Sequence, residues 1–457
     1  MGCMGISVLS AMRSIQTEFV DVSRLQVGMY VELELGWMDH PFPKGSFKIS
    51  SDKQIQTLGA LGLSRVKYVP VKSDVGPIAD EQVKAASPVA APAASPEVQT
   101  LPDADADTQV EVTPVVLEGE RLRQQRAQLI SAQQQSLATC ERQFGDATRQ
   151  YAEVASQISL KPREAREQCQ ILVSGFVGDI SGEGDSALRL LSESAGDKAS
   201  MHSVHVTVLS LLLGKSVGLS PEDMLDLGMA AFLHDVGKTR LPERVRMLDE
   251  SFSPAEYKLY QEHVAQGVFM GKRMELSAGA LKAIGQHHEM IDASGFPGKL
   301  KGESLSMPGK ILALVNRYEN LCNPSKVAAA LTPHEALSMI FAQLKTRFDS
   351  VALSAFIRMM GVYPPGSVVQ LVDDRFALVV SVNSSRPLKP RVIVHEPSVS
   401  KHEALILDLE HAPTIGIRRS LKPTALPREA AEYLSPRQRI SYFFEKSPQT
   451  DAGESIA

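Results

Sequence analysis

The segment from residue 161 to 362 constrains the fold most, because it reads as one helix-forming stretch after another. Helix-start signatures, in which Ser or Thr precedes Pro, recur at Ser220-Pro221, Ser253-Pro254 and Thr332-Pro333. The pattern predicts an all-α core. Six of the 11 histidines fall within a window of 87 residues inside this segment: His202, His205, His234, His263, His287 and His288.

The rest of the chain predicts smaller parts around that core, so we expect a mainly α protein. Strand-like runs around a helical stretch favour a small α+β domain near the N-terminus, and Ala- and Pro-rich residues after it are typical of a flexible linker. A Gln- and Arg-rich stretch then predicts a connector helix with apolar residues too sparse for a deep core face. The predicted parts are a small α+β domain at 16–74, a flexible linker at 75–117, a connector helix at 118–160, a helical domain at 161–362, a small β appendage at 363–420 and a mostly disordered tail at 421–457.

Charge and cysteine usage exclude several classes of protein. Lys and Arg total 48 against 53 Asp and Glu, a net charge of −5, so we expect no DNA or RNA partner. The sequence holds no apolar run long enough to cross a bilayer and no secretory signal, and the expected compartment is the cytoplasm. The 4 cysteines lie far apart without a CxxC pair, which argues against a disulfide framework and against a thiolate zinc site.

The arrangement of the histidines points to a metal centre. His234-Asp235 follows an apolar helix, and His287-His288 places two imidazoles side by side. Several imidazoles are hard to bury as packing alone, because each needs a polar partner. Nitrogen and oxygen donors without thiolate favour Mn, Fe or Zn.

Ordered motifs give the chain a resemblance to a known family. The runs are HSVHV at His202, FLHDVGKTRLPERV at Phe232, EHVAQG at Glu262, QHHEMIDASGFPGKLKGESL at Gln286 and YPPGSVVQLV at Tyr363. In this order and spacing they resemble the HD-GYP phosphohydrolases of bacterial signalling, over about residues 169–397. Residues 20–74, with GMYV, HPF and FKIS, resemble the small DUF3391-like domain often found ahead of such modules.

The resemblance implies an HD-type helical bundle that hydrolyses cyclic di-GMP to pGpG or GMP with divalent metal ions. We expect two ions, with Fe or Mn favoured. Asp235 matches the metal-bridging position, and Lys238 matches a catalytic lysine that meets the substrate phosphate. Gly295, Phe296 and Pro297 match the loop that names the family and are expected to bind substrate. The implied metal ligands are His202, His234, Asp235, His263, His287, His288 and Asn316.

The chain departs from the family pattern at three places. Asn316 stands where the family has a ligand Asp, and Glu319 lies on the same helical face, where we expect it to compensate. Lys198 replaces a glutamate one turn before His202, which predicts no third metal. In the loop, Met290 replaces an arginine, Ala293 a glycine and Phe296 the tyrosine, so we expect altered substrate recognition.

These departures leave other functions open. A catalytically degenerate module could act as a cyclic di-GMP receptor or as a protein-interaction adaptor, and a third hypothesis is a hydrolase for another phosphate ester. Protein partners could bind through the N-terminal domain or through the loop Gly295-Phe296-Pro297, the GFP loop. The connector helix favours a homodimer, but its heptad pattern is too irregular to establish one.

Overall fold

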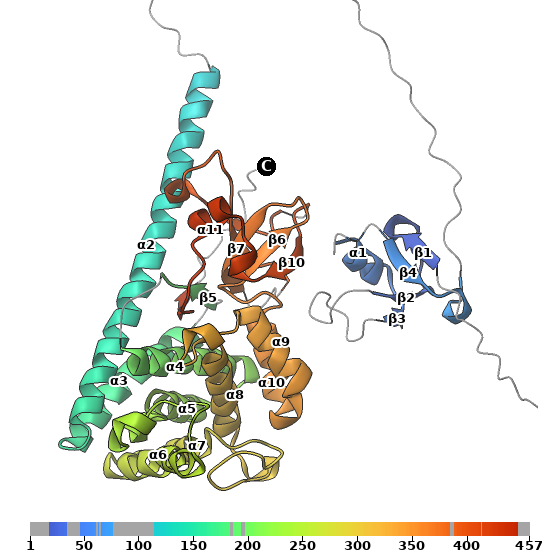
Figure 1. The fold of residues 1–457 in the computed structure, drawn as a ribbon. Helices are drawn as coiled ribbons and strands as arrows, with labels where there is room; N and C mark the ends of the chain where they lie inside the picture. Colours follow the sequence, from blue (N-terminus) through green and yellow to red (C-terminus); the bar gives the residue numbers. More distant parts are fainter. Residues whose placement is uncertain are drawn as a thin grey trace, which may run out of the picture. The chain divides into compact units, whose positions relative to one another are not determined.

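The structure is a computed structural model that describes residues 18–33, 46–60, 63, 65–75, 114–182, 186–192, 197–383, 388–412 and 414–446. The chain divides into two compact units, residues 1–34 with 44–131, and residues 35–43 with 132–457. Figure 1 shows the larger unit as a helical bundle with a β-sheet region at one end. This architecture confirms the predicted mainly α fold with a C-terminal β part.

Near the N-terminus the smaller unit contains an antiparallel sheet and the helix α1, as the strand-like runs predicted. The strand order is β1 (Glu18–Asp21), β4 (Arg65–Tyr68), β2 (Tyr30–Glu32) and β3 (Ser46–Lys48), and α1 spans Asp52–Ala60. Apolar residues of strands, turns and helix form its buried core: Met29, Val31, Ile49, Leu58 and Val69. Most of the predicted linker, residues 76–113, lies outside the described residues.

Helix α2 runs from Pro114 to Gln157, close to the connector helix predicted at 118–160. In the larger unit, the face of α2 that packs on the bundle is rich in apolar side chains. Phe144, Tyr151 and Val154 are all buried in the main core. The expectation of no deep core face is therefore wrong for this half. The aromatic residues and small residues between them give one apolar stripe that the many Gln and Arg residues obscure.

The bundle is built around α4, which is buried continuously from Ser200 to Gly214. A helix that is apolar all round is expected at the centre of a bundle, and α4 packs against α3, α5, α8 and α10. The helices of the bundle are α3 (Pro162–Ser181), α4 (Lys198–Val217), α5 (Pro221–Leu233), α6 (Pro254–Arg273), α7 (Ala278–Gln286), α8 (Met307–Cys322), α9 (Pro333–Gln343) and α10 (Ser350–Met360).

Local capping explains where three of these helices begin. The Ser220 hydroxyl accepts the backbone N–H of Asp223, and Ser253 forms a full capping box with Glu256. Thr332 forms a second capping box, so all three predicted starts are confirmed.

The β part is larger than predicted. Seven strands form one antiparallel sheet, in the order β10-β6-β7-β5-β11, with β8 on β7 and β9 on β8. Their bounds, with those of the short helix α11, are β5 (Ser186–Leu190), β6 (Val368–Leu371), β7 (Phe376–Asn383), β8 (Arg391–Val394), β9 (Ile406–Asp408), β10 (Ile417–Leu421), α11 (Arg428–Leu434) and β11 (Tyr442–Lys446).

The predicted disordered tail from residue 421 is wrong as far as residue 446. Strand β11 pairs with β5, and the side chains of Tyr442, Phe443 and Phe444 are buried. This burial orders the segment, because about 25 cal/mol is gained for each Å² of apolar surface removed from water. Residues 447–457 lie outside the described residues.

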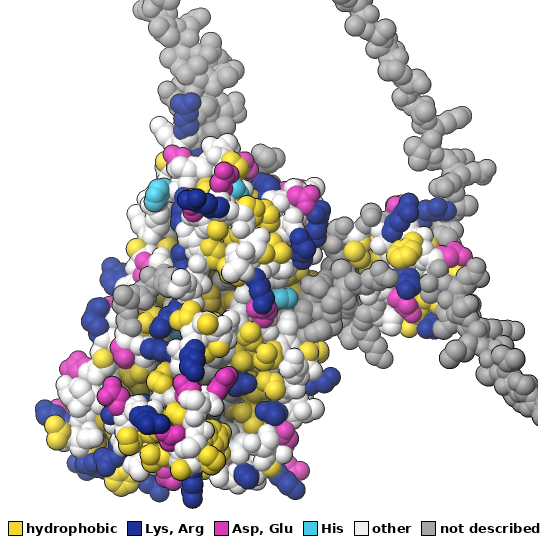
Figure 2. Space-filling view, viewed as in Figure 1, with side chains coloured by type: hydrophobic (Ala, Val, Ile, Leu, Met, Phe, Trp, Pro, Cys, Tyr) yellow, Lys and Arg dark blue, Asp and Glu magenta, His cyan; other side chains and the backbone are white. Residues whose placement is uncertain are grey.

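On the face of the larger unit in Figure 2, basic and acidic side chains are interspersed.

Candidate metal centre and the adjoining cavity

Six of the predicted site residues meet at one point in the bundle, with Asp235 at its centre. His202, His234 and Asp235 form one group, and Asp235, His263, His287 and His288 form another. Within each group, atoms able to bind a metal lie within 4.8 Å of one another. Asp235 belongs to both groups, so the arrangement has the form of two adjacent metal subsites that share one carboxylate.

Four helices bring these side chains together. His202 lies inside α4 and His263 inside α6, whereas His234 and His287 cap the C-termini of α5 and α7. Asp235 directly follows the cap His234, and His288 directly follows the cap His287, so each helix end brings two adjacent side chains to the centre. The short 3₁₀ helix Val236–Arg240 then packs on α6.

Gly237 makes that close packing possible. A Cβ at this position would lie 2.0 Å from the backbone oxygen of His263 and 2.5 Å from the backbone nitrogen of Gly267. Only a residue without a side chain fits here. The glycine in the HDVGK run therefore sets the distance between Asp235 and the histidine of α6.

Backbone carbonyls fix which ring nitrogen faces the centre. Nδ1 of His234 donates to the Ala231 oxygen at 2.8 Å, and Nδ1 of His287 donates to the Ile284 oxygen at 2.7 Å. His263 makes the same bond to the Tyr260 oxygen at 2.5 Å. With Nδ1 protonated, Nε2 of each ring presents a lone pair, as a metal ligand must.

The Nε2 atoms converge in pairs on the two oxygens of Asp235. Nε2 of His202 and Nε2 of His234 lie 3.1 Å apart, and Oδ2 of Asp235 is 3.5 Å from each. Nε2 of His263 and Nε2 of His287 lie 3.2 Å apart, with Oδ1 at 3.6 and 3.8 Å. One carboxylate oxygen therefore faces each histidine pair.

Two buried polar atoms test whether these residues fit a metal. Nε2 of His288 and Oδ1 of Asp235 are both buried without a hydrogen-bond partner among the described residues. Burial lowers the pKa of His263 to about 4, and burial together with the neighbouring imidazoles holds the pKa of His287 and His288 well below the usual value. Neutral imidazoles and an orphaned carboxylate oxygen are the donors that a divalent ion needs, so the residues fit.

Lys238 balances the buried carboxylate. Its Nζ lies 2.5 Å from Oδ2 of Asp235 and 5.5 Å from the ring centre of Tyr260. Burial alone would raise the pKa of Asp235, but the ammonium of Lys238 and the histidines hold it well below the usual range. Asp235 is therefore ionised, as a bridging ligand requires.

Glu319 lies behind His202 rather than among the ligands. Its Oε2 accepts a hydrogen bond from Nδ1 of His202, the nitrogen that faces away from the centre, and its Oε1 accepts from Nδ2 of Asn323 at 3.0 Å. The expectation that Glu319 compensates as a ligand is wrong, because its carboxylate is committed to orienting the imidazole. The carboxamide oxygen of Asn316 accepts from Nδ2 of Asn320 at 2.7 Å, and its role as a ligand stays a prediction.

The GFP loop packs on the centre from the His288 side. The ring of Phe296 stacks on the ring of His288, with 4.4 Å between centroids, and a Cβ on Gly295 would lie 2.4 Å from the His288 oxygen. The buried carboxylate of Glu289 shapes the loop by accepting the backbone N–H groups of Gly298 and Leu300. The loop therefore contacts the candidate ligand His288 directly.

Two of the substitutions in this loop have visible structural effects. Met290 packs against the hydrophobic core, and Ala293 takes a positive φ of 62°. The left-handed region costs a residue with a Cβ about 1 kcal/mol. Glycine, which the resemblance leads one to expect at residue 293, would avoid that cost.

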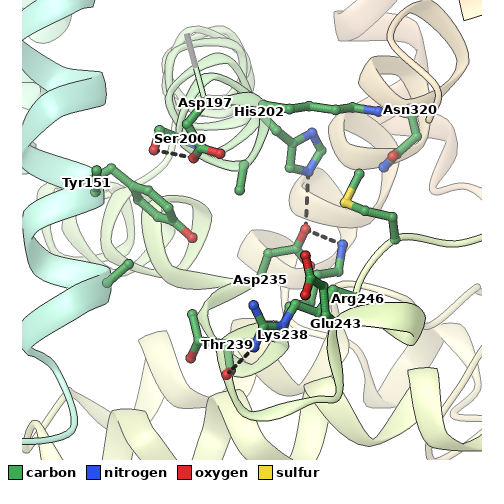
Figure 3. A pocket seen from close by; sticks show the side chains of 15 residues that line it. Tyr151, Asp197, Ser200, His202, Asp235, Lys238, Thr239, Glu243, Arg246 and Asn320 are labelled. Carbon is green, nitrogen blue, oxygen red and sulfur yellow. Dashed lines mark hydrogen bonds and ion pairs between the residues drawn. The ribbon is translucent and has the colours of Figure 1, made fainter. Parts of the chain in front are cut away.

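A cavity of about 510 Å³ opens on the His202 side of the centre (Figure 3). His202, Asp235 and Lys238 line it, and the loop residues Gly295, Phe296 and Pro297 are not in its lining. Sequence reasoning missed most of its other walls. Those from distant segments are Tyr151, Ala152 and Ala155 of α2 and Asn320 of α8, and those near the predicted ligands are Asp197, Ala199, Ser200, Thr239, Glu243, Arg246 and Met247.

Comparison with known families supports the two-part organisation. The model of the HD domain matches residues 187–351, and the model of the domain of unknown function DUF3391 matches residues 18–169. The DUF3391 match therefore extends past the predicted boundary at 74 and includes α2. None of the described helices combines the length and the apolar character of a membrane span.

Three relatives illustrate the similarity. The chain is 25% identical to cyclic di-GMP phosphodiesterase PA4108 of Pseudomonas aeruginosa, over 84% of this chain and 86% of that protein. It is 30% identical to the cyclic di-GMP phosphodiesterase response regulator RpfG of Xanthomonas campestris, over 32% of this chain and 39% of that protein. It is 25% identical to 3'3'-cGAMP-specific phosphodiesterase 1 of Vibrio cholerae, over 34% of this chain and 37% of that protein.

The fold, the histidines around Asp235 and the two family matches agree with one another. As the resemblance to the HD-GYP phosphohydrolases predicted, the chain contains an HD domain, matched over residues 187–351, and a DUF3391 domain ahead of it, matched over residues 18–169.

Proposed function

We propose that this chain is a metal-dependent phosphodiesterase that hydrolyses cyclic di-GMP to pGpG or GMP in bacterial second-messenger signalling. The observation that carries the proposal is the geometry of Asp235, whose two oxygens each face a separate pair of histidine Nε2 atoms. Two similar proteins are named cyclic di-GMP phosphodiesterases, one matching 84% of this chain and the other 32%. Their names support cyclic di-GMP as the substrate.

The proposed cofactor is a pair of divalent ions, Fe or Mn, held through Asp235. One subsite takes His202 and His234, and the other takes His263, His287 and His288. Nitrogen and carboxylate donors without sulfur favour these metals. When bound, two such ions would supply an activated water molecule as nucleophile and positive charge for the phosphate and the leaving oxygen.

The protein's own groups prepare the reaction. Backbone carbonyls hold His234, His263 and His287 in one tautomer, so the Nε2 lone pairs need no rearrangement when a ligand arrives. The ammonium of Lys238 lines the cavity beside Asp235 and attracts a phosphate oxygen there. The GFP loop, with Gly295, Phe296 and Pro297, is proposed to bound the substrate site through its packing on His288.

One observation favours a second function, binding of cyclic di-GMP without turnover. Asn316 supplies no charge at a position where the resemblance implies a ligand Asp, which would weaken a metal subsite. Such a chain would act as a receptor or adaptor, through the N-terminal domain or the GFP loop. A homodimer through α2 is a further prediction.

The cytoplasm is the proposed compartment. The described cysteines, Cys140, Cys169 and Cys322, are buried thiols rather than disulfides, as expected in a reducing environment. A nucleotide second messenger is also found there.

Turnover of cyclic di-GMP tests the proposal. The full chain, purified anaerobically and loaded with Mn or Fe(II), is incubated with cyclic di-GMP and the products are separated by chromatography. The control is Asp235→Asn combined with Lys238→Met, which removes both partners of the buried pair and keeps the charge balanced. We expect a linear product from the native chain and none from the control. Absence of product from a chain with two bound metals would favour the receptor.

A further inference from the structure

The cavity beside the metal centre has basic side chains at two places. Lys238 lies at the centre itself, paired with Asp235, whereas Lys198 and Arg246 line other parts of the wall. Lys198 belongs to the first turn of α4, four residues before His202, so both side chains lie on one face of that helix. Figure 3 shows Arg246 and His202 around the same opening.

Neither of these two cations is neutralised within the described part of the chain. No described carboxylate lies within ion-pair distance of Lys198 or Arg246. Burial lowers the pKa of Lys198, an effect that the Glu319 carboxylate partly offsets, so its ammonium sits in a partly dehydrated setting. Arg246 is held by the backbone, because its Nε donates to the Leu241 oxygen at 2.9 Å and its Nη2 to the Thr239 oxygen at 3.4 Å.

The three carboxylates of the lining do not form ion pairs with Lys198 or Arg246. Asp197 is the N-cap of α4 and accepts from the backbone N–H and the hydroxyl of Ser200 at 2.9 and 2.7 Å. Glu243 is exposed, and Asp235 pairs with Lys238. A partly buried ammonium and an exposed guanidinium held by backbone oxygens, both without carboxylate partners, are donors that suit a phosphodiester anion.

A cyclic dinucleotide has two phosphodiester groups, and only one of them can lie at the metal centre at a time. We infer that Lys198 and Arg246 bind the second phosphate, the one that is not being cleaved, and thereby select cyclic dinucleotides over diesters with a single phosphate. The inference rests on the proposed function, since it takes the cavity to be the substrate site. The two side chains are specificity-determining residues of that site.

Comparing two substrates on the metal-loaded full chain separates selection from general damage. The substrates are cyclic di-GMP and bis(4-nitrophenyl) phosphate, which has one phosphate. The variants are Lys198→Met and Arg246→Met, and the matched control is Lys282→Met, an exposed lysine of α7 outside the cavity lining. The quantity measured is the ratio of kcat/KM for cyclic di-GMP to kcat/KM for the nitrophenyl diester.

We expect each cavity variant to lower this ratio by about tenfold or more, the loss that follows from removing one charge-assisted contact. The Lys282→Met control should keep the native ratio. An unchanged ratio in Lys198→Met and Arg246→Met would overturn the inference. This holds whether hydrolysis of the two substrates is retained or falls equally for both.

A binding measurement decides the inference if the native chain proves inactive. Equilibrium dialysis of cyclic di-GMP against the metal-loaded chain then gives the dissociation constant for the same variants. A rise of about tenfold in Lys198→Met would support the phosphate subsite while the proposed hydrolysis fails. Equal affinity in native chain and variant, or no binding by the native chain, would overturn the subsite itself.

Discussion

The carboxylate of Glu319 accepts a hydrogen bond from Nδ1 of His202, on the side of the ring opposite the metal centre. Burial opposes a charge on His202, but the Glu319 carboxylate outweighs it and raises the pKa of the imidazole. The pair therefore fixes the ring so that Nε2 faces Asp235 and His234. Glu319 is therefore a positioning residue for one of the two proposed metal subsites.

Glu319→Gln is expected to weaken metal binding about 10- to 100-fold, as loss of a carboxylate behind a histidine ligand does. The measurement is a competitive titration with a chelator on the full chain. Glu335→Gln, a change in the capping box of α9, is the control and should keep the native metal affinity. Native metal affinity in Glu319→Gln would contradict the positioning role.

Substituting Asp235 alone should lower the free energy of unfolding more than substituting Asp235 and Lys238 together. Asp235→Asn leaves the half-buried Lys238 ammonium without its carboxylate, so we expect the free energy of unfolding of the EDTA-treated chain to fall, by about 3 kcal/mol at most. Adding Lys238→Met removes that charge and should recover much of the loss. Urea denaturation measures both, and a double variant less stable than the single one would refute this view of the pair.

Acid should destabilise the metal-free chain in a defined range of pH. His263 has a pKa of about 4 in the folded chain against 6.5 for a free imidazole side chain, so the unfolded chain takes up its proton first as the pH falls. The contribution of His263 to the free energy of unfolding is complete above about pH 6.5. It falls by roughly 3 kcal/mol as the pH falls towards about 4. The lowered pKa values of His287 and His288 act in the same direction.

His202 acts in the opposite sense, because its raised pKa gives stability that is present below pH 6.5 and lost as the pH rises through its folded value. Three lowered groups outweigh this one. Urea denaturation of the EDTA-treated chain at pH 7.5 and at pH 5 measures the balance, and His263→Gln should reduce the difference. Equal stability at both values in the native chain would show that these imidazoles are not buried as neutral groups.

Gly237→Ala should disrupt the centre through the backbone. Its Cβ would lie 2.0 Å from the His263 oxygen, so either the 3₁₀ helix or α6 must move. We expect a lower melting temperature and loss of bound metal. Gly175→Ala on α3 is the control, because a Cβ there meets nothing within 4 Å, and helix propensity predicts a gain of about 0.5–1 kcal/mol. Similar melting temperatures for the two variants would contradict the close-packing argument.

Local signals in the sequence predicted the helices and the histidine cluster well. Ser220, Ser253 and Thr332 begin helices because a cap needs only residues within one turn. The adjacent pairs His234-Asp235 and His287-His288 do converge, because each pair follows the end of a helix.

Features that depend on distant segments escaped prediction. Strand β11 is ordered by its pairing with β5, about 250 residues earlier in the chain, and no local pattern reports that contact. Tyr151 reaches the cavity only because α2 packs on the bundle. The role of Glu319 depended on which nitrogen of His202 it meets, which spacing along a helix does not reveal.

Counting the metal ions bound to each chain tests most directly the claim that Asp235 joins two subsites. The native chain and the Asp235→Asn/Lys238→Met variant are loaded with Mn or Fe(II), freed of excess metal and analysed by plasma mass spectrometry, with circular dichroism to show that both are folded. We expect about two ions in the native chain, one for each group around Asp235, and fewer than one in the variant. A native chain that binds no more than one ion, or a folded variant that keeps two, would contradict that claim.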